Sequence, residues 1–97
     1  MVRPSAALEA NRDAVRSVVL AHRVVNPRVF GSVLRAEDTA QSDLDLIVDP
    51  TEETTLLDIG VIRHELLELL GVPVDVVTPG SLPAAFRERV LAEAVAV

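Results

Sequence analysis

The chain has 97 residues, 49% of them hydrophobic, with 15 acidic and 9 basic side chains and a net charge of −6. This length predicts one domain, residues 1–97, with a single hydrophobic core, and argues against an enzyme with a separate substrate-binding domain. Cysteine and lysine are absent, which excludes disulfide bonds, thiolate nucleophiles and Schiff-base chemistry. The excess of acidic residues argues against direct DNA binding.

Hydropathy gives no sign of a membrane segment. No stretch reaches the roughly 18 apolar residues that a membrane-spanning helix needs. The first ten residues lack the continuous apolar run of a signal peptide. We therefore expect a cytoplasmic protein with no membrane partner.

The hydrophobic pattern predicts six elements in the order helix, strand, strand, helix, strand, helix. Asn26 and Pro27 are expected to separate the first helix from the first strand, and residues 31–42 to form a loop or one helical turn. The order predicts an α+β fold, a small mixed β-sheet backed by helices. The predicted elements are a helix from Pro4 to about His22, strands at 28–31, 43–49 and 73–78, a helix from Leu56 to Leu70 closed by Gly71, and a last helix from about Ser81 with a buried stripe of Leu82, Phe86, Val90 and Ala94.

The most informative stretch lies between the first two predicted strands. Gly31 and Ser32 are followed by ten residues and then by Asp43 and Asp45. Side chains two apart on a strand share a face, so the two carboxylates are expected roughly 6–7 Å apart along the strand, as ligands for divalent cations such as Mg²⁺. Gly31 allows backbone N–H groups to approach a phosphate closely, and Ser32 adds a hydroxyl donor.

These residues resemble the signature of the polymerase-beta-type nucleotidyltransferase superfamily, Gly-Ser, a spacer, then Asp-x-Asp, and most closely its minimal nucleotidyltransferase branch. Arg35 and Glu37 match the Arg-x-Glu pairing of that branch, and Ser42 precedes the first acid as in its Ser-Asp pairing. The family's third acid maps onto Asp75 in the PVDVVT strand. One departure is Ala36, where the branch is expected to have glycine.

The resemblance implies a polymerase-beta-like core and a two-metal transfer of AMP from ATP to a hydroxyl. It assigns Asp43, Asp45 and Asp75 as catalytic residues and ligands of two Mg²⁺ ions, and Gly31, Ser32 and Arg35 as nucleotide-binding residues. Minimal members act as antitoxins beside helical HEPN toxins, which implies a stable hetero-oligomer with a HEPN-type toxin and tyrosine as the expected acceptor. The chain itself contains no tyrosine, so such an acceptor must lie on another molecule.

Simpler interpretations of the same residues remain open at this stage. Asp43 and Asp45 are also compatible with the solvated face of an edge strand, and Asp75 with an exposed acid near a strand start. Gly31 could be a turn glycine alone. Arg35 could pair with Glu37 within the loop or bind a phosphate oxygen. The two histidines, His22 and His64, are expected to be packing or surface residues.

Two other functions compete with catalysis on a partner protein. The first is a non-catalytic antitoxin that neutralises its partner by covering it, with the nucleotide site unused. The second is transfer to a small cationic molecule such as an aminoglycoside, which the acidic surface would suit but the missing acceptor domain disfavours.

Overall fold

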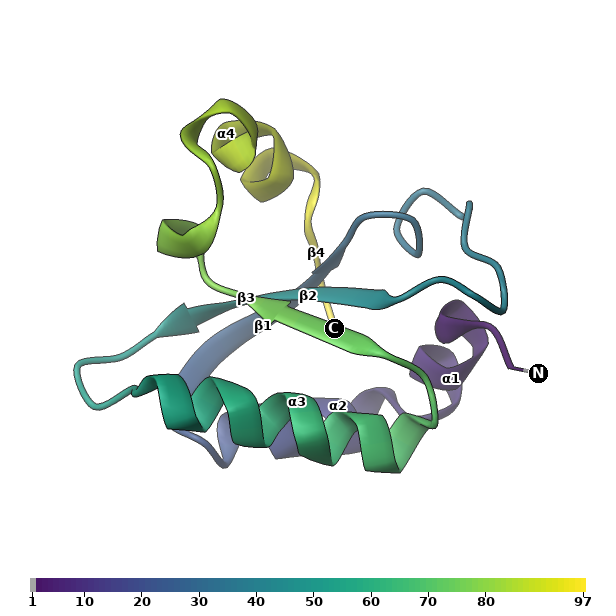
Figure 1. The fold of residues 1–97 in the computed structure, drawn as a ribbon, viewed down its shortest axis with the longest axis horizontal. Helices are drawn as coiled ribbons and strands as arrows, with labels where there is room; N and C mark the ends of the chain where they lie inside the picture. Colours follow the sequence, from purple (N-terminus) through teal and green to yellow (C-terminus); the bar gives the residue numbers. More distant parts are fainter. Residues whose placement is uncertain (1) are drawn as a thin grey trace.

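A mixed four-stranded sheet with the order β3-β2-β1-β4 forms the centre of the molecule in the computed structural model, which describes residues 2–97 (Figure 1). The central strand β2 (Leu44–Pro50) pairs antiparallel with β1 (Val24–Phe30) and parallel with β3 (Val74–Val77). The short β4 (Val95–Ala96) pairs antiparallel with β1. This confirms the predicted α+β fold with a small mixed sheet.

One face of the sheet is covered by three helices, α1 (Pro4–Ala10), α2 (Arg12–Leu20) and α3 (Leu56–Leu70), which lie below it in Figure 1. The alternation predicted for β2 is observed, because Leu44, Leu46 and Val48 are fully buried in the main core. On the opposite face Asp45 and Asp49 are only partly buried, whereas Ile47 is fully buried outside that core. The open face of the sheet is therefore where the acidic side chains lie.

Helix α3 begins and ends where the sequence predicts. Thr55 and Asp58 form a capping box, with the Asp58 carboxylate accepting from the Thr55 N–H at 2.9 Å. Gly71 ends the helix with φ 69°, the left-handed conformation in which glycine has no steric penalty. The helix provides the crossover that parallel pairing of β2 and β3 requires.

The prediction of one long first helix was wrong. Asn11 has φ −135° and interrupts the helical path between α1 and α2. Its side-chain amide donates to the Ala7 carbonyl at 2.9 Å, so a polar side chain satisfies an acceptor at the end of α1. The hydrophobic period continues through this break, because Leu8 and Val15 are both buried in the same core.

Asn26 and Pro27 also act differently from the prediction. They lie inside β1, at an irregularity between Val25 and Arg28 in its pairing with β2. Asn26 adopts φ 55°, a conformation that asparagine tolerates better than most residues. The pair therefore forms a bulge within a longer strand, and α2 has already ended at Leu20.

The last helix, α4 (Ala84–Glu93), follows a short 3₁₀ turn, η1 (Pro79–Ser81), and stands on the other side of the sheet from α1–α3 (Figure 1). The prediction of a buried stripe on it was wrong, since none of its residues is buried and Phe86 is 47% exposed. Strand β4 was not predicted, because a two-residue strand carries no detectable period. Within residues 2–97, no helix has the length and apolar character to cross a membrane.

Asp38 connects the first helix to the loop between β1 and β2. Its side chain is buried, and its carboxylate accepts from the Ser5 N–H at 2.9 Å, in the first turn of α1. The sequence carries no local signal for this cap, because the capping residue lies 33 positions from the N–H that it binds. The hydrogen bond to the Ser5 N–H is the main cause that lowers the pKa of Asp38 below its usual value.

We expect Asp38→Ala to lower the free energy of unfolding by about 1 kcal/mol at pH 7, the usual value of a lost helix cap. Because the pKa of Asp38 is lowered in the folded state, its contribution is present above pH 4 and is lost as the pH falls below that. Urea unfolding at pH 7 and pH 3 measures both effects. Glu52→Ala, at an exposed position, is the control. An equal loss of stability in Asp38→Ala at both pH values would contradict a stabilising role for the ionised carboxylate.

Candidate active site

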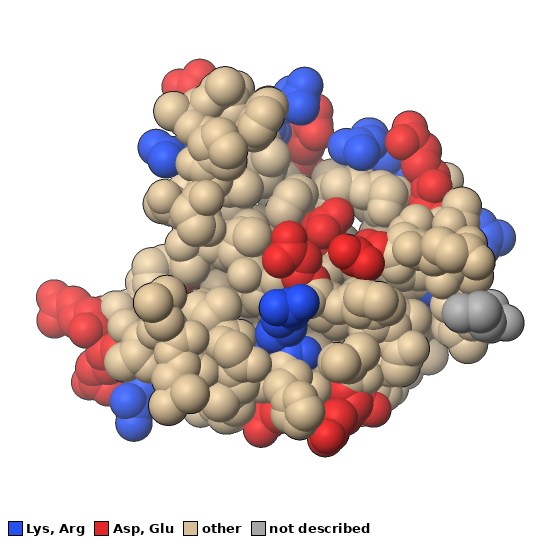
Figure 2. All heavy atoms as spheres, viewed as in Figure 1, with Lys and Arg blue, Asp and Glu red and all other residues tan. Residues whose placement is uncertain are grey.

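Strand register brings the two most distant acidic residues of the candidate site together. Asp45 on β2 and Asp75 on β3 are direct partners in the parallel pairing, so their side chains emerge on the same face of the sheet, on strands about 4.8 Å apart. Asp43 lies immediately before β2, two residues from Asp45. Figure 2 shows acidic side chains gathered between α4 and the loop that follows β1, with a basic side chain beside them.

Asp45 is the member of this group with the most perturbed chemistry. Its pKa is raised from 3.8 to about 6, first because the side chain is partly removed from water. The negative charges of Asp75 and then Asp43 raise it further, while Arg35 acts in the opposite direction. The site thus concentrates negative charge that the protein itself compensates only in part.

Gly31 has a reason to be glycine that the sequence does not reveal. It follows β1 directly, with φ 77°, and the preceding Phe30 pairs with Asp45. A Cβ atom built on Gly31 would overlap with Oδ2 of Asp45. Gly31 therefore leaves room for the central carboxylate, in addition to the close backbone approach predicted for a phosphate.

Ser32 and Arg35 lie in the turns that follow Gly31. The carbonyl of Ser32 accepts from the Glu37 N–H at 2.9 Å, and that of Gly31 accepts from the Arg35 N–H at 3.2 Å. Arg35 Nε contacts Glu37 Oε2 at 3.3 Å, with both side chains more than half exposed. Such exposed ion pairs within a loop contribute little, so the guanidinium can exchange partners at small cost.

Ala36 occupies the position where the branch is expected to have glycine, and it adopts φ 57°. A left-handed conformation costs a residue with a Cβ about 1–2 kcal/mol, whereas glycine adopts it freely. We expect Ala36→Gly to raise the free energy of unfolding by up to about 1 kcal/mol, since part of the relief is offset by the flexibility of glycine in the unfolded chain. Urea denaturation measures this. Ala40→Gly in the same loop is the control and should not stabilise, and an equal gain in both variants would contradict the strain at Ala36.

Ser42 and the histidines have structural roles. The Ser42 hydroxyl accepts from the Thr39 N–H at 2.8 Å and so fixes the end of the loop before Asp43. His22 Nε2 lies 2.8 Å from Glu65 Oε2, and His64 Nε2 lies 3.1 Å from Glu68 Oε1. Both histidines therefore pair with acids on α3, as packing or surface residues do.

The donor set fits a hard divalent cation, although no three His, Cys, Asp or Glu side chains within residues 2–97 form a preassembled metal cluster. Carboxylate oxygens are the ligands that Mg²⁺ prefers, and Mg²⁺ commonly takes one or two of them together with substrate phosphates. The pKa of Asp45 is raised first by burial and then by the charges of Asp75 and Asp43, and a bound cation would relieve the repulsion among these carboxylates. Together with the glycine turn beside them, these acids are compatible with the class of proteins that transfer phosphoryl or nucleotidyl groups.

Comparisons with known proteins agree with this class. The family model for the nucleotidyltransferase domain matches residues 12–97. Protein adenylyltransferase MntA of Thermococcus cleftensis is 34% identical over 93 residues, covering 88% of this chain and 94% of that protein. A protein of Methanocaldococcus jannaschii, named as a candidate protein adenylyltransferase, is 40% identical over 80 residues, covering 82% of this chain and 86% of that protein.

Solved structures show the same fold. A structure described as a candidate minimal nucleotidyltransferase has 47% sequence identity and a TM-score of 0.84, covering 93% of this chain and 92% of that one. A crystal structure of a toxin-antitoxin with AMP-PNP has a TM-score of 0.75 at 17% identity, covering 89% and 71%. The chain belongs to the nucleotidyltransferase domain family, in its minimal nucleotidyltransferase branch, which confirms the resemblance found in its motifs.

Proposed function

We propose that the chain is a protein adenylyltransferase and antitoxin. It transfers AMP from ATP to a hydroxyl, with tyrosine the expected acceptor, of a HEPN-type toxin with which it forms a stable hetero-oligomer. The names of the relatives, protein adenylyltransferases among them, and the structural neighbour that is a toxin-antitoxin with AMP-PNP support this proposal. The single observation that carries it is the pairing of Asp45 with Asp75 on the open face of the sheet.

The proposed reaction is an in-line displacement at the α-phosphorus of ATP. The acceptor oxygen forms a bond to that phosphorus, the bond from the α-phosphorus to the bridging oxygen breaks, and pyrophosphate leaves with the bond's electron pair. In this proposal Asp75 receives the proton of the acceptor hydroxyl. Ser32, the backbone N–H groups at Gly31 and the Arg35 guanidinium orient the triphosphate.

Asp43, Asp45 and Asp75 are the residues that would hold two Mg²⁺ ions. Bound there, the ions would supply charge stabilisation for the attacking and leaving oxygens. Each ion carries a charge of +2, so two ions would change the local charge of the three carboxylates from −3 to about +1. A site of this charge suits an incoming polyphosphate. Asp45 must be ionised to act as a ligand, and a bound cation favours that form over the protonated one.

The test follows label from α-labelled ATP into the partner that co-purifies with the chain. We expect Mg²⁺-dependent labelling by the wild-type chain, and a loss of at least about 1000-fold in Asp43→Asn/Asp45→Asn, because two ligands of the proposed ions lose their charge. Glu52→Asn/Glu53→Asn, on the exposed turn after β2, is the charge-matched control and should label normally. Equal labelling by the Asp43→Asn/Asp45→Asn variant would reject the proposal.

Exposed apolar side chains favour one alternative, a non-catalytic antitoxin that covers its partner. Phe86 on α4 is 47% exposed, and Leu56 and Leu57 at the start of α3 are 91% and 75% exposed. Leu56 and Leu57 are adjacent, and neighbouring exposed apolar side chains of this kind are a common feature of surfaces that bind another protein. Full neutralisation of the toxin by Asp43→Asn/Asp45→Asn would favour this function, whereas its loss together with the loss of labelling would favour catalysis.

A further inference from the structure

The order of the strands places the glycine turn and the third acid on opposite sides of the central strand β2. The turn at Gly31 and Ser32 follows β1, on one side of Asp45, whereas Asp75 lies on β3, on the other side. In phosphoryl transfer the attacking and leaving oxygens lie roughly in line on opposite sides of the phosphorus. If the triphosphate lies on the Gly31 side, as in the proposed function, the acceptor must approach from the β3 side.

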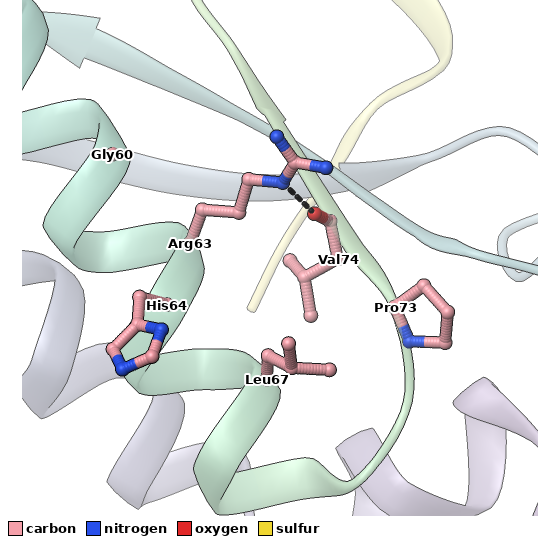
Figure 3. A pocket seen from close by; sticks show the side chains of 6 residues that line it. All are labelled: Gly60, Arg63, His64, Leu67, Pro73 and Val74. Carbon is pink, nitrogen blue, oxygen red and sulfur yellow. Dashed lines mark hydrogen bonds between the residues drawn. The ribbon is translucent and has the colours of Figure 1, made fainter.

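A groove is present on that side of the molecule. It has a volume of about 410 Å³ and lies between α3 and β3 (Figure 3). Leu67, Pro73 and Val74 give it an apolar wall, and Val74 is the direct neighbour of Asp75. The volume falls within the range of about 300–1,000 Å³ that is usual for ligand pockets. The residues lining the groove are Gly60, Arg63, His64, Leu67, Pro73 and Val74.

No strand within residues 2–97 pairs with the outer side of β3, because β3 is the edge strand of the sheet. The Pro73 carbonyl points toward β2, where it accepts from the Leu44 N–H at 2.9 Å. The Val74 carbonyl points away from β2 and accepts from Arg63 Nε at 3.2 Å. Backbone groups alternate along a strand, so the N–H and C=O of Val76 also face outward, where an added strand could pair with them.

Arg63 supplies a positive charge at this edge. Figure 3 shows its guanidinium beside β3, with the bond from Nε to the Val74 carbonyl drawn. Its two terminal nitrogens have no hydrogen-bond partner within residues 2–97. A guanidinium held in this way can donate to a carbonyl or carboxylate of a bound polypeptide.

We propose, on the basis of the proposed function, that this groove and the outer edge of β3 form the acceptor-binding subsite. The occupant is an extended segment of the partner polypeptide, added as a strand beside β3. Because successive side chains of a strand point to opposite faces, one apolar side chain enters the groove while the hydroxyl side chain next to it in sequence lies on the open face beside Asp75. The subsite therefore selects a hydroxyl residue with an apolar neighbour.

Leu67→Glu tests the subsite with little risk to folding, because Leu67 is 44% exposed. Placing a carboxylate on the apolar wall is expected to raise the KM for the partner, purified apart from the chain and added at varied concentration, about 10-fold or more, and to leave the KM for ATP unchanged, because the nucleotide binds on the other side of Asp45. Leu69→Glu is the matched control, since Leu69 lies on the same helix, is 39% exposed and does not line the groove. It is expected to retain wild-type values of both constants.

Mass spectrometry of the labelled partner gives a second readout. The modified residue is expected to have an apolar neighbour in sequence, and replacing that neighbour by aspartate should lower labelling to the same extent as Leu67→Glu. An unchanged KM for the partner in Leu67→Glu, or an equal rise in Leu69→Glu, would overturn the subsite while leaving the proposed function intact. Absence of labelling by the wild-type chain would overturn the proposed function and the subsite with it.

Discussion

Asp45→Asn is expected to reduce nucleotidyl transfer at least about 100-fold while making the metal-free protein more stable, because the same charge that would hold a cation is repelled by its neighbours. Partial removal from water is the largest cause that raises the pKa of Asp45 to about 6, and the negative charges of Asp75 and Asp43 raise it further. A neutral amide of the same shape removes this repulsion. A substitution that damages function and improves folding is typical of a residue kept for its chemistry.

The pH dependence of this gain has a definite sign. A carboxyl whose pKa is raised in the folded state binds its proton more tightly there than in the unfolded chain, so its ionisation costs stability as the pH rises from about 4 to about 6. The free energy of unfolding of Asp45→Asn should therefore equal that of the wild type below pH 4 and exceed it above pH 6.5. We expect a gain of about 1 kcal/mol at pH 7.5, after discounting for the partial exposure of the side chain to water.

Asp49→Asn is the matched control on the same strand. The Asp49 carboxylate accepts from Arg28 at 2.5 Å and from the Asn26 amide at 3.0 Å, so its removal should lower stability rather than raise it. Thermal unfolding in EDTA measures both variants. Adding Mg²⁺ with a non-hydrolysable ATP analogue should raise the Tm of the wild type and of Asp49→Asn but not that of Asp45→Asn. A Tm rise of equal size in Asp45→Asn would contradict a role for this carboxylate in holding the cation.

Patterns that are local in sequence were predicted well. The helix from Leu56 to Leu70, its glycine cap and the alternation of β2 follow from spacings within a few residues. The grouping of Asp43 with Asp45 follows from the same period of two. The residues alone could not predict that Asp75 pairs with Asp45 across the sheet, because strand register depends on the whole sheet.

The wrong or missing predictions concern features that a local pattern does not determine. Asn11 ends one helix within a hydrophobic period that continues on both sides of it, and Asn26 lies at an irregularity inside a strand, where the sequence predicted a break before the strand. The stripe predicted on the last helix has the right spacing, but a period alone does not say whether the apolar face is covered within the same chain. Arg63 was not predicted as a site residue, since an arginine on a helix gives no sign that it reaches the edge of a strand.

Gly31→Ala is expected to lower the free energy of unfolding by about 3 kcal/mol, from two separate costs. One is the left-handed backbone at φ 77°, and the other is the overlap of the new Cβ with Oδ2 of Asp45. Gly71→Ala isolates the first cost, because Gly71 has φ 69° and a Cβ added there would meet no atom within 4 Å. We expect that control to lose only about 1–2 kcal/mol. Equal losses at the two glycines would contradict the overlap.

The overlap itself can be measured by a double-mutant cycle between Gly31→Ala and Asp45→Ala. Removing the carboxylate leaves space for the new methyl group, so Gly31→Ala should cost about 1 kcal/mol or more less in the Asp45→Ala background than in the wild type. Urea unfolding of the four proteins gives this coupling energy. Strict additivity would mean that the carboxylate moves aside freely. Coupling would mean that the Asp45 carboxylate occupies the space that a Cβ at position 31 would need, so that the turn proposed to bind the triphosphate must have glycine there to make room for the central acid of the site.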